Sequence, residues 1–245
     1  MKDSIFCPNE KTEGYYTQDR KEMLKYIPRA LRKVLDVGCG SGDFGVLLKS
    51  RKDVEVWGVE VCENAAKEAV NRIDRVIIGD IERGDLGLPL NYFDCIVFND
   101  VLEHLLYPWN VLVSCKAFLQ NGGYIVASIP NIRYYSNIKN LLFWKNWEYK
   151  DDGILDKTHL RFFTERSIRE MFLVCGYHML KIEGIKEYKF SRKLKILNFL
   201  LKSSLNDMKY ERFAVVALKM ENKGYTCESL LHETIEETIR TEGEL

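Results

Sequence analysis

The chain has no excess of charge of either sign, because 36 lysine and arginine residues balance 36 aspartate and glutamate residues among its 245 residues. Without a net positive field, a general attraction to nucleic acid or to an anionic membrane is not expected. Long apolar runs are also missing, since stretches such as YIVASI have the length of a strand and are too short to span a bilayer. We therefore expect no membrane span and no nucleic-acid partner.

No cysteine pair has the C-x-x-C spacing of a structural zinc site, although the chain contains seven cysteines. Their odd number and their position in apolar stretches, as for Cys95 in FDCIVF, predict buried free thiols in a reducing compartment. The first residues, MKDSIFCPNEKTEGYY, also lack the apolar segment typical of an export signal. These absences predict a cytoplasmic protein without a structural zinc site.

Strands and helices alternate between residues 33 and 131. The strands are continuous apolar runs, which is typical of a parallel sheet with both faces covered by helices. We expect strands at 33–38, 54–61, 75–80, 92–100 and 122–131, and helices at 43–50, 63–73 and 110–119. The pair Gly122–Gly123 is expected to end the last of these helices. The pattern predicts an α/β fold with a doubly wound, Rossmann-like, mostly parallel sheet and helices on both faces.

The regular alternation ends after residue 131. Residues 131–163 are rich in aromatic side chains and lysine, and we expect an aromatic-rich lid insert there, with either a small core of its own or a stacking surface for a sugar or planar acceptor. A helix at 165–176, a strand at 178–188, a second insert at about 190–210 and a strand at 211–220 follow. A single domain over 1–222 is predicted, with an acidic tail at 223–245 that is flexible or helical.

The segment VLDVGCGSGDFG places Gly38, Gly40 and Gly42 at alternate positions after the first strand. Glycines allow a sharp turn and let a ligand touch the backbone, at the sheet edge where such folds bind ligands. A dinucleotide-binding loop would need a small residue where Asp43 stands, and an acid there would repel a pyrophosphate. Asp36 suits instead a ligand that carries an ammonium group and no phosphate.

This loop resembles motif I of the class I S-adenosylmethionine-dependent methyltransferases, in particular the type 11/23-like group of bacterial small-molecule or sugar methyltransferases. The resemblance covers about residues 15–190, because VEVWGVEV, IIGDIE, YFDCIVFNDVLEHLLYP and DKTHLRFFTERSIREMFLVCGY match later segments of that family in order. It implies an enzyme that uses S-adenosylmethionine and releases S-adenosylhomocysteine. A doubly wound protein that binds another nucleotide, or none, is the alternative.

The resemblance also implies the residues that bind the cofactor. Glu60 would accept hydrogen bonds from both ribose hydroxyls, since a carboxylate has two oxygens, and Asp80 would pair with the adenine amino group. Arg20 would hold the cofactor carboxylate, or would be a solvated arginine on a surface helix. The expected cofactor-binding residues are Asp36, Gly38, Cys39, Gly40, Gly42, Glu60, Val61, Asp80, Ile81, Asn99, Asp100, Tyr16 and Arg20.

Two histidines are the catalytic candidates. His104, just after the fourth strand, is either a general base or substrate contact, or a residue that orients its loop. His159, in DKTHLRFFT, is either a base near the transferred methyl group or a structural residue that holds its loop to Asp156 or to Glu103. A metal site would need more ligands than Glu103 and His104, and none is evident from the sequence, so no metal is expected.

The sequence predicts methyl transfer to a small molecule or to a sugar or glycan precursor, as in polysaccharide biosynthesis, with O-methylation ahead of N-methylation of a small amine. A non-catalytic cofactor-binding scaffold and a homodimer both stay open. An amino-DNA methyltransferase is disfavoured, because NDVLEH stands where the NPPY-type tetrad would follow the fourth strand.

Overall fold

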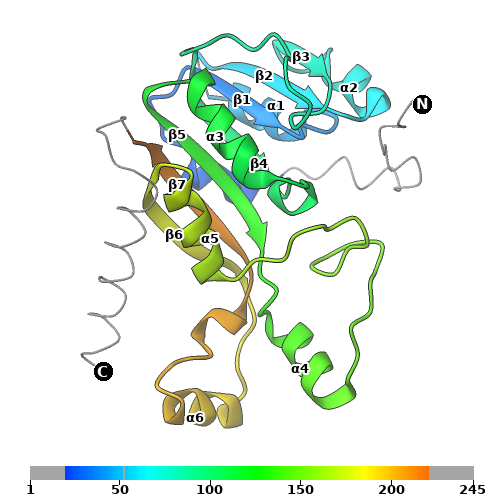
Figure 1. Cartoon of the computed structure of the whole chain (residues 1–245), viewed down its shortest axis with the longest axis vertical. Coiled ribbons are helices and arrows are strands. Elements are labelled where there is room, and N and C mark those ends of the chain that lie inside the picture. The colour runs from blue at the N-terminus through cyan, green and yellow to red at the C-terminus, as the bar shows by residue number, and fades with distance from the viewer. Residues whose placement is uncertain (1–19, 52, 221–245) are drawn as a thin grey trace.

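The computed structural model describes residues 20–51 and 53–220. They form a seven-stranded sheet with the strand order β3-β2-β1-β4-β5-β7-β6 and with helices on both faces (Figure 1). The predicted Rossmann-like fold is thereby confirmed. Tyr16 and the predicted acidic tail at 223–245 lie outside the described residues, and the single domain over 1–222 stays a prediction.

The sheet has a parallel part and an antiparallel edge. The parallel strands are β1 (Lys33–Val37), β2 (Glu55–Glu60), β3 (Arg75–Ile78), β4 (Phe93–Asn99) and β5 (Leu119–Pro130). Strand β7 (Tyr210–Lys219) runs antiparallel between β5 and β6 (Tyr177–Glu187). Because β1 pairs with both β2 and β4, the strand order reverses beside β1, which is where doubly wound sheets bind ligands.

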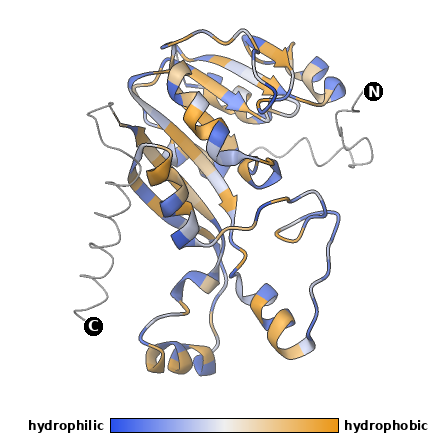
Figure 2. Ribbon diagram, viewed as in Figure 1, coloured by the Kyte–Doolittle hydropathy of each residue, from blue (hydrophilic) through white to orange (hydrophobic). Residues whose placement is uncertain are grey.

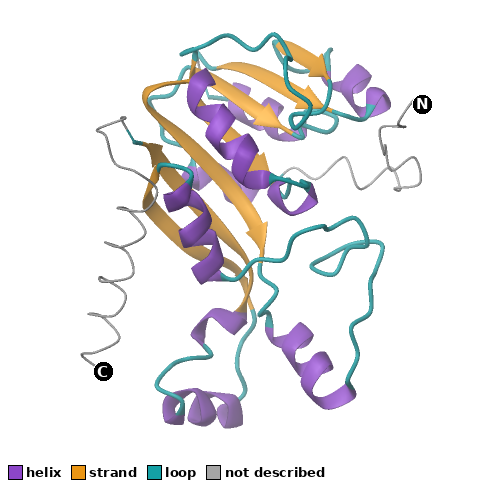
Figure 3. Cartoon of the chain, in the orientation of Figure 1, coloured by secondary structure: helices purple, strands orange, loops and turns teal. Residues whose placement is uncertain are grey.

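Helices lie on both faces of the sheet (Figure 3). Alternate side chains of the strands supply two cores, one on each face. Val34 packs in the core that contains Met23 and Leu48, whereas its neighbour Leu35 packs in the core that contains Leu112. The first face is covered by η2 (Lys21–Tyr26), α1 (Asp43–Lys49) and α2 (Glu63–Ala69), and the second by α3 (Pro108–Phe118) and α5 (Glu165–Val174). This burial on both faces explains the continuous apolar strands.

The prediction that Gly122–Gly123 ends a helix is wrong. Helix α3 ends at Phe118, and Leu119 already has extended backbone and begins β5. The glycines lie inside β5, where the pairing with β4 shifts register between Phe93 and Cys95. Gly122 has a φ of +73°, so the pair accommodates an irregularity in the strand and does not cap the helix.

Two helices lie away from the sheet at one end of the molecule (Figure 1): α4 (Tyr135–Trp144), in the first predicted insert, and α6 (Arg192–Leu200), in the second. Both carry exposed apolar side chains, including Leu142 and Phe143 on α4 and Phe199 on α6, and Figure 2 shows this apolar character along both ribbons. The short helices η3 (Leu102–His104) and η4 (Asn206–Lys209) complete the described elements.

Five cysteines fall within the described ranges, and all of them are buried free thiols, as predicted: Cys39, Cys62, Cys95, Cys115 and Cys175. Burial raises the pKa of the Cys115 thiol to about 12. The helices of the described ranges are all too short or too polar to cross a membrane.

Candidate active site

The glycine loop after β1 is held against the neighbouring strand by its backbone. Gly38 and Cys39 both donate N–H hydrogen bonds to the carbonyl oxygen of Val59 on β2, at 2.8 and 3.2 Å. Gly38 has a φ of +69°, and a β-carbon built there would lie 2.6 Å from Val101 Cγ2. The turn therefore requires a residue without a side chain, as the sequence predicts.

Asp43 stands where a dinucleotide-binding loop would have a small residue, and its carboxylate accepts hydrogen bonds from side chains of the protein. Its Oδ1 accepts a hydrogen bond from Arg72 Nη2 at 2.5 Å, and its Oδ2 accepts one from Ser41 Oγ at 3.0 Å. Gly42 precedes it as the N-cap of α1, with a φ of +86°. These two residues shape the start of the helix and do not line the cavity described below.

Asp36, near the end of β1, is a buried carboxyl group that is only 1% exposed. Its Oδ2 has no hydrogen-bond partner among the residues that the structure describes. Burial, and after it the charge of Glu60, raises the pKa of Asp36 to about 8. Such a group is costly in a ligand-free protein, and a ligand that brings a cation to it removes that cost.

Glu60, the last residue of β2, joins the glycine loop to the segment after its own strand. Its Oε2 accepts the N–H of Gly40 at 2.8 Å, and its Oε1 accepts the N–H of Cys62 at 2.9 Å. Burial raises its pKa despite these bonds. Each carboxylate oxygen has a further lone pair, so Glu60 can still accept the two hydroxyls of a ribose.

A cavity of about 760 Å³ opens at this edge of the sheet. It brings together most of the site residues predicted from the sequence. Those that line it are Arg20, Asp36, Gly38, Cys39, Gly40, Glu60, Val61, Asp80, Ile81, Asn99, Asp100, His104 and His159. Gly42 does not line this cavity, and Tyr16 is outside the described residues.

Asp80, which follows β3, and Asn99, which ends β4, contribute further polar groups to the cavity. Asp80 Oδ1 accepts the N–H of Glu82 at 2.9 Å, and its Oδ2 lies 3.2 Å from Arg83 Nε. In Asn99, neither the amide oxygen nor the amide nitrogen has a partner within the described ranges, although both are buried. Asn99 thus offers a donor and an acceptor to a ligand.

Asp100, which follows β4, is surrounded by two arginines. Arg20 Nη2 donates a hydrogen bond to its Oδ2, and Arg212 Nε on β7 lies 3.2 Å from the same oxygen. Ser128 Oγ donates to Oδ1 at 2.5 Å. Arg212 is not among the site residues predicted from the sequence, although a charged residue inside the apolar run ERFAVVALK is a signal of a buried partner.

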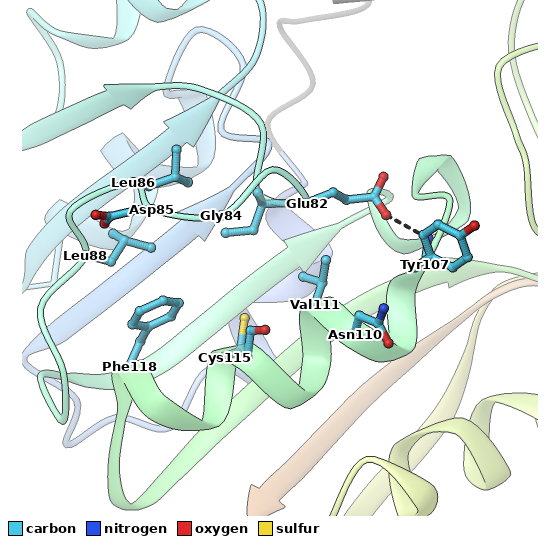
Figure 4. Close-up of a pocket in the computed structure, with 12 residues that line it drawn as sticks. Glu82, Gly84, Asp85, Leu86, Leu88, Tyr107, Asn110, Val111, Cys115 and Phe118 are labelled. Carbon is cyan, nitrogen blue, oxygen red and sulfur yellow. Dashed lines mark hydrogen bonds between the residues drawn. The ribbon is translucent and has the colours of Figure 1, made fainter.

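A second, smaller cavity of about 260 Å³ lies beside the first, between α3 and the loop after β3 (Figure 4). Ile81 and Glu82 line both cavities. The Glu82 carboxylate accepts the N–H groups of Leu106 and Tyr107 at 3.0 and 2.7 Å, and the second of these bonds is drawn in Figure 4. Glu82 therefore ties the loop after β3 to the start of α3.

The far end of the large cavity is formed by η3 and by the turn around residues 152–160. The carbonyl oxygen of Glu103 accepts the N–H groups of Leu160 and Arg161, at 2.8 and 3.0 Å, and so holds this turn against η3. His159 Nε2 consequently lies 3.9 Å from Glu103 Oε1, and the rings of His104 and His159 meet edge to face with centroids 4.6 Å apart. Both histidines thus belong to one cluster.

Two members of this cluster are buried, and His104 is half-buried. Glu103 is 1% exposed and His159 is 8% exposed. Burial raises the pKa of Glu103 well above its usual value, and it lowers the pKa of His104 to about 4, with a further contribution from His159. His104 is therefore a neutral imidazole near pH 7.

Residues 131–163 contribute to the cavity through polar side chains. Asp152, Asp156, Lys157 and Thr158 line it, whereas none of the tyrosines, tryptophans and phenylalanines of this segment does within the described residues. Trp147 packs instead on Phe162, with ring centroids 5.5 Å apart. The predicted lid insert with a small core of its own stays a prediction, and the aromatic side chains of this segment do not line this cavity.

A sequence profile described as a methyltransferase domain matches residues 9–182, which is more than half of the chain. The chain belongs to this family. The resemblance to class I S-adenosylmethionine-dependent methyltransferases is confirmed, and S-adenosylmethionine is the cofactor. The buried polar atoms of Asp36 and Asn99, which lack partners within the described ranges, together with the open glycine loop, fit a ligand with an ammonium group and an adenosyl moiety.

Individual relatives are distant from this methyltransferase. A ubiquinone biosynthesis O-methyltransferase from Histophilus somni is 26% identical over 170 residues, which cover 62% of this chain and 71% of the relative. A 27-O-demethylrifamycin SV methyltransferase from Amycolatopsis mediterranei is 29% identical over 39% of this chain and 37% of its own length. A methyltransferase structure from Archaeoglobus fulgidus superposes with a TM-score of 0.62 at 24% identity, over 81% of this chain and 91% of that one.

Proposed function

We propose that this methyltransferase transfers the methyl group to a hydroxyl oxygen of a small molecule, with a sugar or glycan precursor among the candidate acceptors. The observation that supports this proposal is the single cavity that joins the predicted cofactor residues to the cluster of Glu103, His104 and His159. The two relatives described above are named as O-methyltransferases, or as acting on an O-demethylated compound. The buried free thiols favour a reducing, cytoplasmic setting.

In this proposal, residues of β1, β2 and the loop after β3 hold the cofactor. Glu60 would bind the ribose and Asp80 the adenine, while Asp36 and Asn99 would face the amino-acid end. When bound, S-adenosylmethionine supplies a methyl group on a sulfonium, which leaves as a neutral thioether. Arg20 is engaged with Asp100, so its predicted contact to the cofactor carboxylate requires that it contact both groups.

The protein's further task is to orient the acceptor oxygen in line with the methyl carbon and the sulfur. Orientation of this kind lowers the barrier by roughly 7–11 kcal/mol. A hydroxyl must also lose its proton, and His104 and His159 are the candidates to activate it, since both line the cavity. The polar residues of the turn at 152–158 would select the acceptor.

The test uses the purified full chain, tritiated-methyl S-adenosylmethionine, and panels of phenols, sugar derivatives and amines. We expect binding of S-adenosylhomocysteine by calorimetry and labelled product from a hydroxylated acceptor. Exchange of Glu60 for alanine should weaken binding of S-adenosylhomocysteine by roughly 1.5–3 kcal/mol. Labelled amines alone would replace O-methylation by N-methylation, and binding with no product from any panel would favour the scaffold.

A further inference from the structure

The cluster of Glu103, His104 and His159 has the composition of a metal site. One carboxylate oxygen and one ring nitrogen from each histidine all lie within 4.8 Å of one another. From the sequence no metal is expected, because no ligand beyond Glu103 and His104 is evident there. The fold supplies the third ligand, since the carbonyl oxygen of Glu103 holds the turn that carries His159.

The orientation of His159 suits a metal ligand. Its Nδ1 lies 2.9 Å from the carbonyl oxygen of Ile154, which can only accept a hydrogen bond. The proton is therefore on Nδ1, and the lone pair is on Nε2, the atom that faces Glu103. A histidine that ligates a metal commonly donates its other ring N–H to a carbonyl or carboxylate in this way.

His104 is oriented in the same manner. Its Nδ1 lies 3.2 Å from the carbonyl oxygen of Thr158 and 3.1 Å from Thr158 Oγ1. The Thr158 hydroxyl donates its own proton to Asp156 Oδ1 at 2.7 Å, so it acts as an acceptor toward the histidine. His104 therefore also carries its proton on Nδ1 and its lone pair on Nε2.

Glu103 provides an independent indication of a ligand. Both of its carboxylate oxygens are buried and lack a hydrogen-bond partner among the residues that the structure describes. Its nearest cationic partner is His159 at 3.9 Å, which pairs with it only when protonated. A buried carboxylate without donors is costly, and a cation bound beside it would offset that cost.

The positive charges near the cluster are partly compensated by Asp100, although Arg212 and Arg20 both act on Glu103. Arg20 and Arg212 are the nearby guanidinium groups, and both face Asp100. Asp156, on the other side of the cluster, adds a negative charge near Thr158. The cluster lines the large cavity, so positions of the metal that are not filled by the protein would face the acceptor.

We propose that Glu103, His104 and His159 form a binding site for a divalent cation of the zinc type, with its open positions toward the acceptor oxygen. Two imidazoles and a carboxylate favour zinc and similar ions over magnesium. Ligand atoms around zinc are about 3.4 Å apart, so ligand atoms that lie within 4.8 Å of one another need a contraction of up to about 1.4 Å. The role of the metal in binding the acceptor rests on the proposed O-methylation, but the site itself does not.

The test is calorimetry of Zn²⁺ binding to the full chain after chelation, together with the absorption spectrum of its Co²⁺ complex. We expect one equivalent of zinc to bind, and cobalt bands without a thiolate charge-transfer band. Glu103→Gln and His159→Ala should weaken zinc binding on the order of tenfold or more, whereas His178→Ala, at an exposed histidine of β6, should bind zinc like the unchanged protein. No binding, a thiolate band, or unchanged affinity in Glu103→Gln would overturn the proposal.

Two further measurements guard against variants that fail to fold. In the unchanged protein, zinc should shift the ring ¹⁵N signals of His104 and His159 and leave those of His178 in place; a shift of His178 alone refutes the site. S-adenosylhomocysteine binding is measured on the same samples. If this product binds and zinc does not, the metal site fails and the proposed cofactor-binding residues are unaffected. If zinc binds and the product does not, the metal site stands and the proposed binding of the cofactor in this cavity fails.

Discussion

Arg212 Nε on β7 lies 3.2 Å from Asp100 Oδ2, directly after β4, and so connects the antiparallel edge of the sheet to the candidate active site. The arginine is 7% exposed, and the same carboxylate also accepts a hydrogen bond from Arg20. The two arginines compensate the charge of Asp100 in a buried place, and this arrangement gives the first prediction.

Exchange of Arg212 for methionine should lower the free energy of unfolding by roughly 2–4 kcal/mol, because Asp100 loses one of its two cationic partners in a buried place. Urea denaturation followed by circular dichroism measures the change. The control is Arg169→Met, which removes an exposed ion pair with Glu165 on α5 and should cost no more than about 0.5 kcal/mol. Equal costs for the two variants would contradict the prediction.

A β-carbon at Gly38 should disrupt the loop after β1. The alanine would need a φ of +69° and would lie 2.6 Å from Val101 Cγ2. Gly122 is a matched control, since its φ is +73° and nothing lies within 4 Å of the added carbon. The left-handed backbone should lower the free energy of unfolding of both variants by about 1 kcal/mol. In Gly38→Ala the contact with Val101 should lower it by at least about 1 kcal/mol more.

The measurements for this pair are thermal unfolding and binding of S-adenosylhomocysteine. Gly38→Ala should also weaken product binding, whereas Gly122→Ala should leave it unchanged, because Gly122 is outside the cavity lining. The assignment of the loop to the cofactor would be lost if Gly38→Ala bound the product normally.

Product binding should strengthen as the pH rises toward 8. Burial and the facing charge of Glu60 raise the pKa of Asp36 from 3.8 to about 8, so Asp36 is protonated at neutral pH in the ligand-free protein. An ammonium group favours the carboxylate, and binding therefore releases a proton. Affinity should rise by up to about tenfold per pH unit below pH 8 and level off above it.

Calorimetry in buffers of different ionisation enthalpy measures the released proton directly. In Asp36→Asn this proton release and the associated rise in affinity should disappear. The raised pKa of Asp36 also affects the stability of the ligand-free protein. Between pH 3.8 and about pH 8 the folded state binds a proton that the unfolded state does not, so the free energy of unfolding falls as the pH rises. A pH-independent affinity from 6 to 8 would remove Asp36 from contact with the ammonium group.

Two aspartates with the same local geometry separate cofactor binding from loop stability. Asp80 Oδ1 accepts the N–H of Glu82 at 2.9 Å, and Asp85 Oδ1 accepts the N–H of Gly87 at 2.9 Å. Only Asp80 lines the large cavity. Asp80→Ala should weaken product binding by about 1–2 kcal/mol, and Asp85→Ala should not. A similar loss in both variants would mean that the turn, and not an adenine contact, is responsible.

The parallel half of the fold could be predicted from the sequence because its signals are local. Apolar runs of strand length, separated by helices, define β1 to β5, and polar residues at their ends gather at one edge of the sheet. Asp36 was found in this way, whereas Glu60, Asp80 and Asn99 were implied by the resemblance to the methyltransferase family, and all four line the cavity. The position of β7 between β5 and β6 could not be predicted, since antiparallel insertion depends on pairing between segments far apart in the chain.

The acceptor end of the site was only partly predictable for the same reason. His159 was recognised as a candidate with Asp156 or Glu103 as its structural partner, and the structure places the side chains of His159 and Glu103 3.9 Å apart. The closeness of His159 to His104 depends on backbone hydrogen bonds from Leu160 and Arg161 to Glu103, which leave no pattern in the sequence. Arg212 was overlooked because its partner lies in another strand segment.

The insertion of β7 between β5 and β6 sets the order in which the enzyme is assembled during translation. Residues 33–130 contain every parallel strand, but β5 stays an open edge and β6 has no neighbour until residues 210–219 leave the ribosome. Arg212 is on that late segment. A nascent chain is therefore unable to complete the charge balance around Asp100 before its last strand is made, and the active site matures only after synthesis has passed that strand.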